Sequence, residues 1–232
     1  MSRRARFTLG GLVAPLLLAG CASGPPQASW LGSAARAQER ATEAYLSGDE
    51  RVAQAELAKA RAETARTGKA VEMARVELTH CAARVASLVL QPCAAFEPLA
   101  IDAGAAERAY AAYLAGQHPL DPDQIAQLPA HHRPVALATA AAQAEAAVAA
   151  IEDPLARTVA AGVLLRTGRL TPATARAARD SASEQGWRRP LLAWLGVLAR
   201  LAQDAGDQPE TERLRRWMER VAPNSDQNRA TE

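Results

Sequence analysis

The chain has 232 residues, of which 27 are basic and 25 acidic, so that its formal net charge is +2, and 49% of its residues are hydrophobic. This size fits one or two globular domains, and the balance of charged and hydrophobic residues is not that of a chain that is disordered throughout. Aromatic residues make up only 4%, which argues against a β-sandwich or barrel because strands are enriched in aromatic and β-branched side chains. Alanine is the most abundant residue, and its helix propensity favours helices packed on helices.

The first twenty residues have the layout of a secretory signal. Arg3, Arg4 and Arg6 form a positive start, Leu9 to Leu18 form a short apolar run, and small residues precede Cys21. Because the apolar run is well below the ~20 residues needed to span a bilayer, a cleaved leader over residues 1–20 is favoured over a transmembrane helix.

The tetrapeptide Leu18-Ala19-Gly20-Cys21 resembles the lipobox of bacterial lipoproteins. In that family the cysteine thiol is diacylated, the chain is cut before it, and the new amine receives a further acyl chain such as palmitate. The resemblance implies that Cys21 is the lipid attachment site; an ordinary signal peptide with a chance cysteine is the alternative. An Asp after the cysteine commonly retains such proteins in the inner membrane. Because Ala22 stands there, the resemblance implies the outer membrane, facing the periplasm.

Two consequences follow for the mature chain. Removing residues 1–20 takes away three of the 27 basic residues and none of the 25 acidic ones, which leaves a net charge of −1. A nucleic-acid partner is therefore not expected. Residues 21–28 form a short tether that reaches at most ~25 Å, so it keeps the folded part near its membrane.

The remaining sequence predicts an all-α fold, with residues 29–92 as an N-terminal helical hairpin containing a long helix. Residues 93–223 are expected to form a C-terminal core of helical hairpins, and residues 224–232 a disordered tail. A capping residue followed by proline marks helix starts, and glycine at the end of an apolar stretch marks helix stops. The starts are Asp121-Pro122, Asp153-Pro154 and Thr171-Pro172, and the stops are Gly48, Gly116, Gly168 and Gly206.

The segments that end at the first two glycines, Ala44 to Gly48 and Ala112 to Gly116, nearly repeat one another. Together with Ala53, Leu57 and Ala60, they make the chain similar to tetratricopeptide repeats, which are 34-residue helix–turn–helix units. The stops are, however, 68, 52 and 38 residues apart. The resemblance therefore implies a degenerate TPR-like array, with an irregular α-bundle as the alternative.

Two further helices follow from the sequence pattern. A narrow apolar stripe is expected along one long helix, packing within its own domain or forming an intermolecular coiled coil; it comprises Val71, Ala74, Leu78, Cys81, Val85 and Leu88. An alanine-rich helix is expected from Ala136 to Ile151. Since alanine buries little apolar area, we expect the main core in residues 135–221, where larger side chains follow.

Cys81 and Cys93 are the only cysteines left after lipidation, and an even pair in an exported chain predicts a disulfide. The helix that carries Cys81 is expected to run to about Val89. Gln91-Pro92 must then reverse the chain to bring the two Cα atoms within ~7 Å. The expected role is to fasten the helix end to the next segment.

Catalytic and metal-binding patterns are weak. His131 and His132 are adjacent and cannot easily aim at one ion, so a polar helix-entry segment is expected, with no metal and no cofactor. The sequence contains no nucleophile-elbow, phosphate-loop or zincin motif. Acidic and basic residues alternate on what we expect to be solvated helix faces, as in Arg36, Glu39, Arg40 and Glu43. We therefore predict that the protein is not an enzyme.

The best candidate for a partner-binding surface combines Trp187, Arg188, Arg189 and Trp194, because Trp and Arg are enriched at binding hot spots. The alternative is that Trp187 anchors a helix start and the arginines are solvated. We expect an anchored protein-interaction module with an envelope protein as partner. The other hypotheses are an envelope enzyme such as a cell-wall hydrolase and a structural lipoprotein that self-associates through the Val71 to Leu88 stripe.

Overall fold

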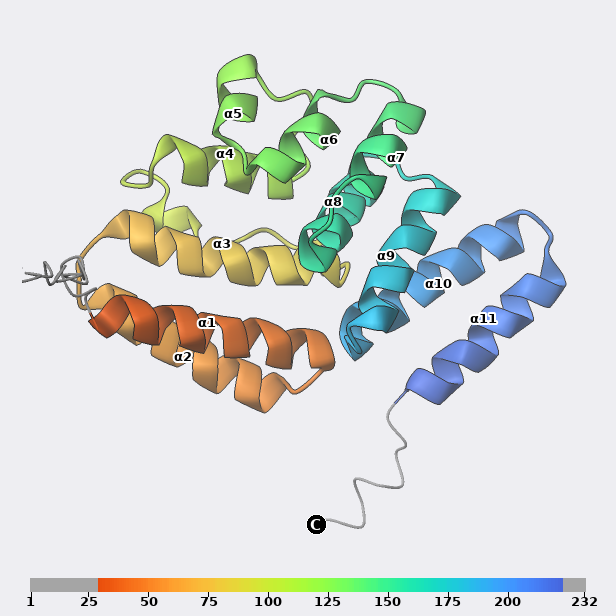
Figure 1. Cartoon of the computed structure of the whole chain (residues 1–232), viewed down its shortest axis with the longest axis horizontal. Coiled ribbons are helices and arrows are strands. Elements are labelled where there is room, and N and C mark those ends of the chain that lie inside the picture. The colour runs from red at the N-terminus through yellow and green to blue at the C-terminus, as the bar shows by residue number, and fades with distance from the viewer. Residues whose placement is uncertain (1–28, 223–232) are drawn as a thin grey trace, which may run out of the picture.

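The computed structural model describes residues 29–222, and the predicted leader, tether and tail, Cys21 included, lie outside them. The described residues form eleven α-helices packed as consecutive hairpins and contain no strand, which confirms the all-α prediction (Figure 1). The α-helices are α1 (Ser29–Ser47), α2 (Glu50–Ala65), α3 (Ala70–Ala86), α4 (Ala105–Leu114), α5 (Pro122–Gln127), α6 (Arg133–Leu137), α7 (Ala141–Ala149), α8 (Pro154–Arg166), α9 (Pro172–Glu184), α10 (Arg188–Asp204) and α11 (Gln208–Val221). Two short 3₁₀ helices, η1 (Glu97–Leu99) and η2 (Ala130–His132), precede α4 and α6.

The predicted helix starts and stops are confirmed. Asp121, Asp153 and Thr171 each accept a hydrogen bond from the backbone N–H three residues on, at 2.8, 2.6 and 3.1 Å, so each caps its helix. The four predicted glycine stops all have positive φ, between 68° and 92°, the left-handed conformation that ends a helix without steric cost. Gly68 and Gly186, which were not singled out, do the same at 64° and 71°.

The repeated segments before Gly48 and Gly116 have equivalent places in the fold. Tyr45 and Tyr113 are 4% and 2% exposed, and the leucine after each of them is fully buried. Each segment ends a helix, α1 and α4 respectively, with its tyrosine and leucine turned into the core. The near-repeat therefore reflects a shared packing role.

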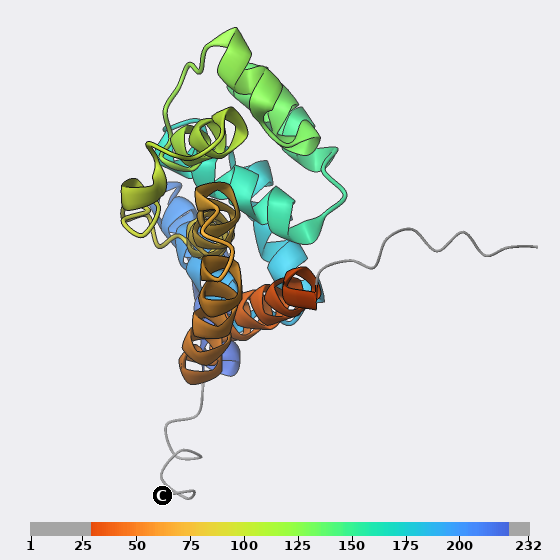
Figure 2. The same cartoon turned by 90° about the vertical axis from the view of Figure 1, so that its left-hand side faces the viewer.

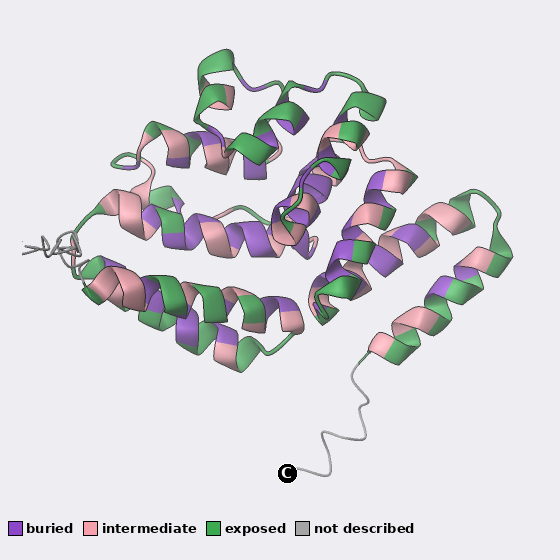
Figure 3. Ribbon diagram, viewed as in Figure 1, coloured by how far each residue is buried: buried purple, intermediate pink, exposed green. Residues whose placement is uncertain are grey.

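Helix α8 is the centre of the molecule. Different residues of it belong to three of the four hydrophobic clusters, which pack it against α3 and α4, against α9 and α10, and against α6 and α7. Figure 3 shows the buried residues gathered on α3, α8 and the helices beside them, while α5 is exposed over most of its surface. Gly162 of α8 crosses α3 so closely that a Cβ would lie 2.5 Å from the carbonyl oxygen of Val85.

Three predictions about the helices are corrected. The main core is not confined to residues 135–221, because the first cluster draws most of its members from α3 and α4. The alanine-rich helix predicted from Ala136 to Ile151 is wrong: α6 ends at Leu137, and a new helix, α7, begins at Ala141. The side-chain oxygen Oε1 of Gln143 accepts hydrogen bonds from the backbone N–H groups of Thr139 and Ala140, and these bonds stabilise the break.

The predicted long helix ends earlier than expected, at Ala86. Leu88 lies beyond it with φ 59°, so a residue other than glycine takes the left-handed position that reverses the chain. The stripe residues that α3 does bury, Ala74, Leu78, Cys81 and Val85, pack into the first cluster of this chain.

Three ion pairs connect α1 to α2, α2 to α3 and α3 to α4. Each joins a partly exposed arginine to a carboxylate at most 9% exposed on the next helix. Because a buried carboxylate is stable only when it is paired, these pairs hold each helix in register with the next. The pairs are Arg40–Glu56 at 2.7 Å, Arg61–Glu77 at 2.6 Å and Arg75–Glu107 at 2.9 Å.

In the turned view of Figure 2, α1 and the segment from α5 to α6 project to the same side, and α8 lies between them. The cavities described below lie between these elements.

Candidate functional site

The predicted disulfide between Cys81 and Cys93 is present, with the two Cα atoms 5.7 Å apart. The chain reverses after α3, and the Arg84 guanidinium helps by donating to the side-chain oxygen of Gln91 at 3.0 Å. The bridge fastens the end of α3 to the segment that leads to η1. Since both cysteines pack with the first hydrophobic cluster, the bridge has the structural surroundings that were predicted for it.

Three of the four candidate partner-binding residues contact other helices of the chain, namely Trp187, Arg189 and Trp194. Trp194 is fully buried and donates from Nε1 to the carbonyl oxygen of Ala86 at 3.0 Å. Trp187 is 7% exposed at the start of α10 and donates from Nε1 to Glu43 at 2.9 Å. Trp194 is therefore inaccessible to a partner in this structure, and the alternative in which Trp187 anchors a helix start is favoured.

The two arginines beside Trp187 differ from one another. The Arg189 guanidinium lies 4.2 Å over the Tyr45 ring and donates to the Tyr45 carbonyl oxygen at 2.7 Å and to Glu50 at 2.7 Å. It joins α10 to α1 and α2, so it is not simply solvated. Arg188 is exposed, and of the four residues it is the one whose side chain is open to a partner.

The two adjacent histidines also have different surroundings. Together they form the helix entry that was predicted, since η2 leads directly into α6. His131 is exposed, but His132 is 1% exposed, with Nδ1 3.3 Å from the Tyr113 hydroxyl. Burial, with a smaller contribution from the charge of His131, lowers the pKa of His132 to about 3. A polar segment is therefore the wrong description of His132, which is a neutral core residue.

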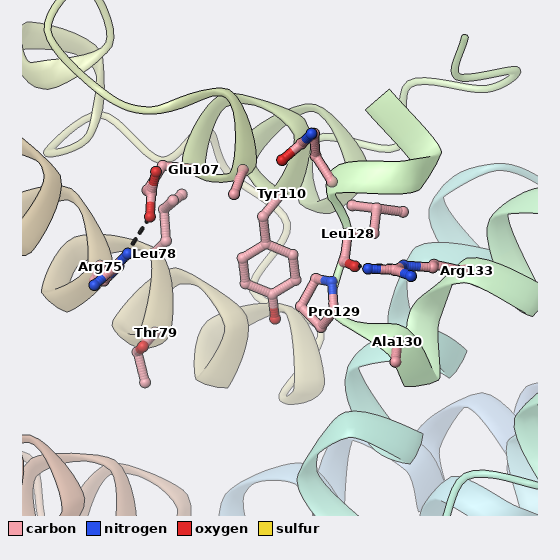
Figure 4. A pocket seen from close by; sticks show the side chains of 11 residues that line it. Arg75, Leu78, Thr79, Glu107, Tyr110, Leu128, Pro129, Ala130 and Arg133 are labelled. Carbon is pink, nitrogen blue, oxygen red and sulfur yellow. Dashed lines mark hydrogen bonds and ion pairs between the residues drawn. The ribbon is translucent and has the colours of Figure 1, made fainter. Parts of the chain in front are cut away.

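A first cavity of about 360 Å³ lies between α3, α4 and the segment from Gln127 to Arg133 (Figure 4). Its apolar surface comes from Leu78, Leu128 and Pro129, with the Tyr110 ring between them. Arg75, paired with Glu107, stands on one side of Tyr110, and the Arg133 guanidinium stands on the other. An apolar group entering this cavity therefore finds a cation on either side.

A second cavity adjoins the first, and a third adjoins the second. The second, of about 650 Å³, shares Thr79 with the first and is lined mainly by α1 and the start of α8. The third, of about 410 Å³, shares Asp153 with the second and lies beside His131 and Glu152. We refer to these three cavities as the groove.

Tyr110 connects the groove to the core. Its ring stacks on Tyr113 and on His132, with centroids 6.3 and 5.8 Å away. Burial, together with the negative charge of Asp153, raises the pKa of Tyr110, so its hydroxyl stays protonated at neutral pH. The groove therefore offers two hydroxyl groups, those of Tyr110 and Thr79, as neutral hydrogen-bonding partners.

The groove residues Thr79 and Tyr110 belong to no sequence motif of a binding site, and the pattern around Asp153 predicts only a helix cap. One sequence feature could have pointed to an acidic surface, because charge is unevenly distributed along the chain. Residues 93–153 contain eight acidic and two basic residues, whereas residues 154–222 contain seven acidic and twelve basic ones. The meeting of elements from α1, α3, α4 and α8 depends on the tertiary fold and has no local pattern.

The described part of the chain contains neither a candidate membrane-spanning helix nor a candidate metal-binding cluster. Between residues 29 and 222, no helix is both long and apolar enough to cross a membrane. Within the same residues, no cluster of three or more His, Cys, Asp or Glu side chains is placed to hold a metal ion.

Comparison with known proteins gave no match: no family model, no curated protein and no solved structure matches the chain. The resemblances to lipoproteins and to tetratricopeptide repeats therefore stay predictions.

Proposed function

We propose that the protein is an outer-membrane lipoprotein, anchored through Cys21, whose helical body faces the periplasm. In this proposal it acts without catalysis as a protein-interaction module, an accessory factor for an envelope assembly, secretion or peptidoglycan machine. The groove is the observation that carries the proposal. Arrays of helical hairpins bind partners on extended concave surfaces. Three connected cavities support such a role here: the first two are lined mainly by α1, α3, α4 and the start of α8, and the third by η2, α6, α7 and the segment before α8.

The alternative of a cell-wall hydrolase is less well supported. Such an enzyme needs a carboxylic acid that can donate a proton to the leaving group. The carboxylate of the first cavity, Glu107, is 7% exposed and accepts a hydrogen bond from Arg75 at 2.9 Å. Glu107 is therefore held in an ion pair with Arg75 between α3 and α4, an arrangement that suits a structural role better than that of an acid catalyst.

Self-association through the Val71 to Leu88 stripe is also less well supported. Four of its six residues are buried against other parts of the same chain. A coiled coil with a second copy would have to remove α3 from α4 and α8. The groove requires no such rearrangement, because its cavities already lie between packed helices.

The anchor is tested by replacing the cysteine of the lipobox. Cys21→Ser is expected to release the protein from the membrane fraction into the soluble periplasmic fraction, and the wild-type protein is expected to stay with the outer membrane. Mass spectrometry of the wild-type N-terminus should find acyl chains on Cys21. Continued membrane association of the variant, or an unmodified chain beginning at Met1, would refute the anchor.

The interaction module is tested by photo-crosslinking in cells. A photoreactive amino acid is placed in the groove at Thr42 or Gln185, and as a matched control on the exposed outer face of α2 at Gln54. The expected result is one recurrent envelope protein crosslinked from the groove positions and absent from the Gln54 control. Crosslinks that are the same from all three positions would contradict a partner held in the groove.

A further inference from the structure

We infer that the groove binds an extended polypeptide segment that carries lysine or arginine side chains. This inference rests on the proposed function and specifies the chemistry of the partner. It starts from the charges that line the second and third cavities. Four carboxylates line these cavities, those of Glu39, Glu43, Glu152 and Asp153, against the single cation Arg40.

Arg40 does not neutralise these carboxylates, because its guanidinium is engaged on the neighbouring helix α2. Its Nε and Nη2 atoms both donate to one oxygen of Glu56, at 2.9 and 2.7 Å. Lys59 donates to the other oxygen of Glu56 at 2.5 Å. Arg40 therefore forms its ion pair with Glu56 on α2 and with none of the carboxylates of the groove, and even when Arg40 is counted in full, four carboxylates against one cation leave an excess of negative charge.

Neutral donors hold two of the four carboxylates. Glu43 accepts from the Trp187 indole at 2.9 Å, and Asp153 accepts from the backbone N–H of Ala156 at 2.6 Å. Neither donor is a cationic side chain, so neither contact is an ion pair. Glu39 and Glu152 have no ion-pair partner in the described part of the chain. This stretch of the groove therefore attracts cations.

The first cavity differs in chemistry from the other two. It pairs Arg75 with Glu107, holds a second arginine, Arg133, and has apolar walls around Tyr110. It suits an uncharged apolar side chain, while the carboxylates of the second and third cavities suit ammonium or guanidinium groups. The second cavity shares Thr79 with the first and Asp153 with the third, so a chain that follows these shared residues passes from one cavity to the next. An extended chain rises about 3.3 Å per residue and turns alternate side chains the same way, so alternate side chains can enter successive cavities.

The inference is tested with three fluorescent peptides of equal length, in which every second residue is serine. The residues between the serines face one side of the extended chain, and they are leucine at one end followed by lysine, by glutamine or by glutamate. Binding to the purified wild-type protein is measured by fluorescence anisotropy at low and high salt. The lysine peptide is expected to bind at least roughly tenfold more tightly than the glutamate peptide, and high salt should weaken its binding. Equal affinity for the three peptides, or no binding by any of them, would overturn the inference.

Charge reversal locates the binding site. Glu39→Lys and Glu152→Lys are each expected to weaken binding of the lysine peptide roughly threefold to tenfold. Glu219→Lys is the matched control, because it reverses an exposed carboxylate on α11, outside the groove. Circular dichroism of each variant verifies the fold. An equal loss in the control would overturn the groove as the site.

The two proposals fail in distinguishable ways. A partner that crosslinks from Thr42 in cells but binds through an acidic or neutral segment would leave the proposed function standing and overturn this inference. If crosslinks do not distinguish the groove from Gln54, the proposed function itself fails.

Discussion

The buried histidine His132 makes the stability of the fold dependent on pH. In the folded chain its pKa is about 3, whereas an unfolded chain has the ordinary value of about 6.5. Below about pH 6.5 the unfolded state therefore binds a proton that the folded state excludes. The contribution of neutral His132 to stability is complete above the unfolded pKa and is lost progressively as the pH falls toward the folded one.

The expected loss of unfolding free energy follows from the pKa values of His132 in the folded and the unfolded chain. Each pH unit between them costs about 1.4 kcal/mol, so a shift from pH 7 to pH 5 removes about 2 kcal/mol through His132 alone. This is a large part of the 5–15 kcal/mol that is typical of folded domains. The replacement His132→Gln removes the titration and keeps an oxygen that can accept a hydrogen bond from Tyr113.

Urea unfolding followed by far-ultraviolet circular dichroism at pH 7 and pH 5 measures this effect. Between the two pH values the wild-type protein should lose about 2 kcal/mol more unfolding free energy than His132→Gln. The other three histidines are present in both proteins, so the difference isolates His132. His131→Gln, which changes the exposed neighbour, should keep the wild-type pH dependence. If the wild-type protein and His132→Gln lose the same free energy, His132 is not held neutral by burial.

Three other changes test the packing. Cys93→Ser should lower the unfolding free energy by about 3 kcal/mol, the entropy of closing a loop of this length, and reductant should lower the melting temperature of the wild-type protein but not of the variant. Gly162→Ala should lower the unfolding free energy by about 1–3 kcal/mol, because α8 crosses α3 closely at this residue. Gly196→Ala, where an added Cβ would meet open space, should raise the unfolding free energy by about 0.5–1 kcal/mol in thermal unfolding. The same sign for both would contradict the close crossing. Glu77→Ala should cost about 1–2 kcal/mol, and a double-mutant cycle with Arg61→Ala that gives no coupling would contradict the ion pair between α2 and α3.

The features that the sequence predicted well are local ones. A capping side chain bonds to a backbone group three residues away, as at Asp153, and a glycine stop depends on the conformation of one residue, as at Gly48. The disulfide was also predictable, because its cysteines are separated by only 12 positions. In each case the interacting groups are close in sequence, so the local sequence pattern is enough to predict the contact.

The features that the sequence did not predict depend on distant contacts. Trp187 and Arg189 have the composition of a binding surface, but their partners lie 144 residues earlier in the chain. The end of α3 was misplaced because Leu88 adopts a conformation that favours glycine. The groove needed the relative positions of α1, α3, α4 and α8, which follow from the crossing at Gly162 and the three ion pairs between successive helices.

The contacts of α10 with α1 and α3 give the array a fixed size. In an open solenoid each repeat touches only its neighbours, so evolution can add or delete repeats at either end. Here Trp187, Arg189 and Trp194 attach the tenth helix to the first three. Adding or deleting a hairpin between these helices would break the contacts of α10 with α1, α2 and α3. A fragment that ends before α10 would expose the faces of α1 and α3 that these three residues cover.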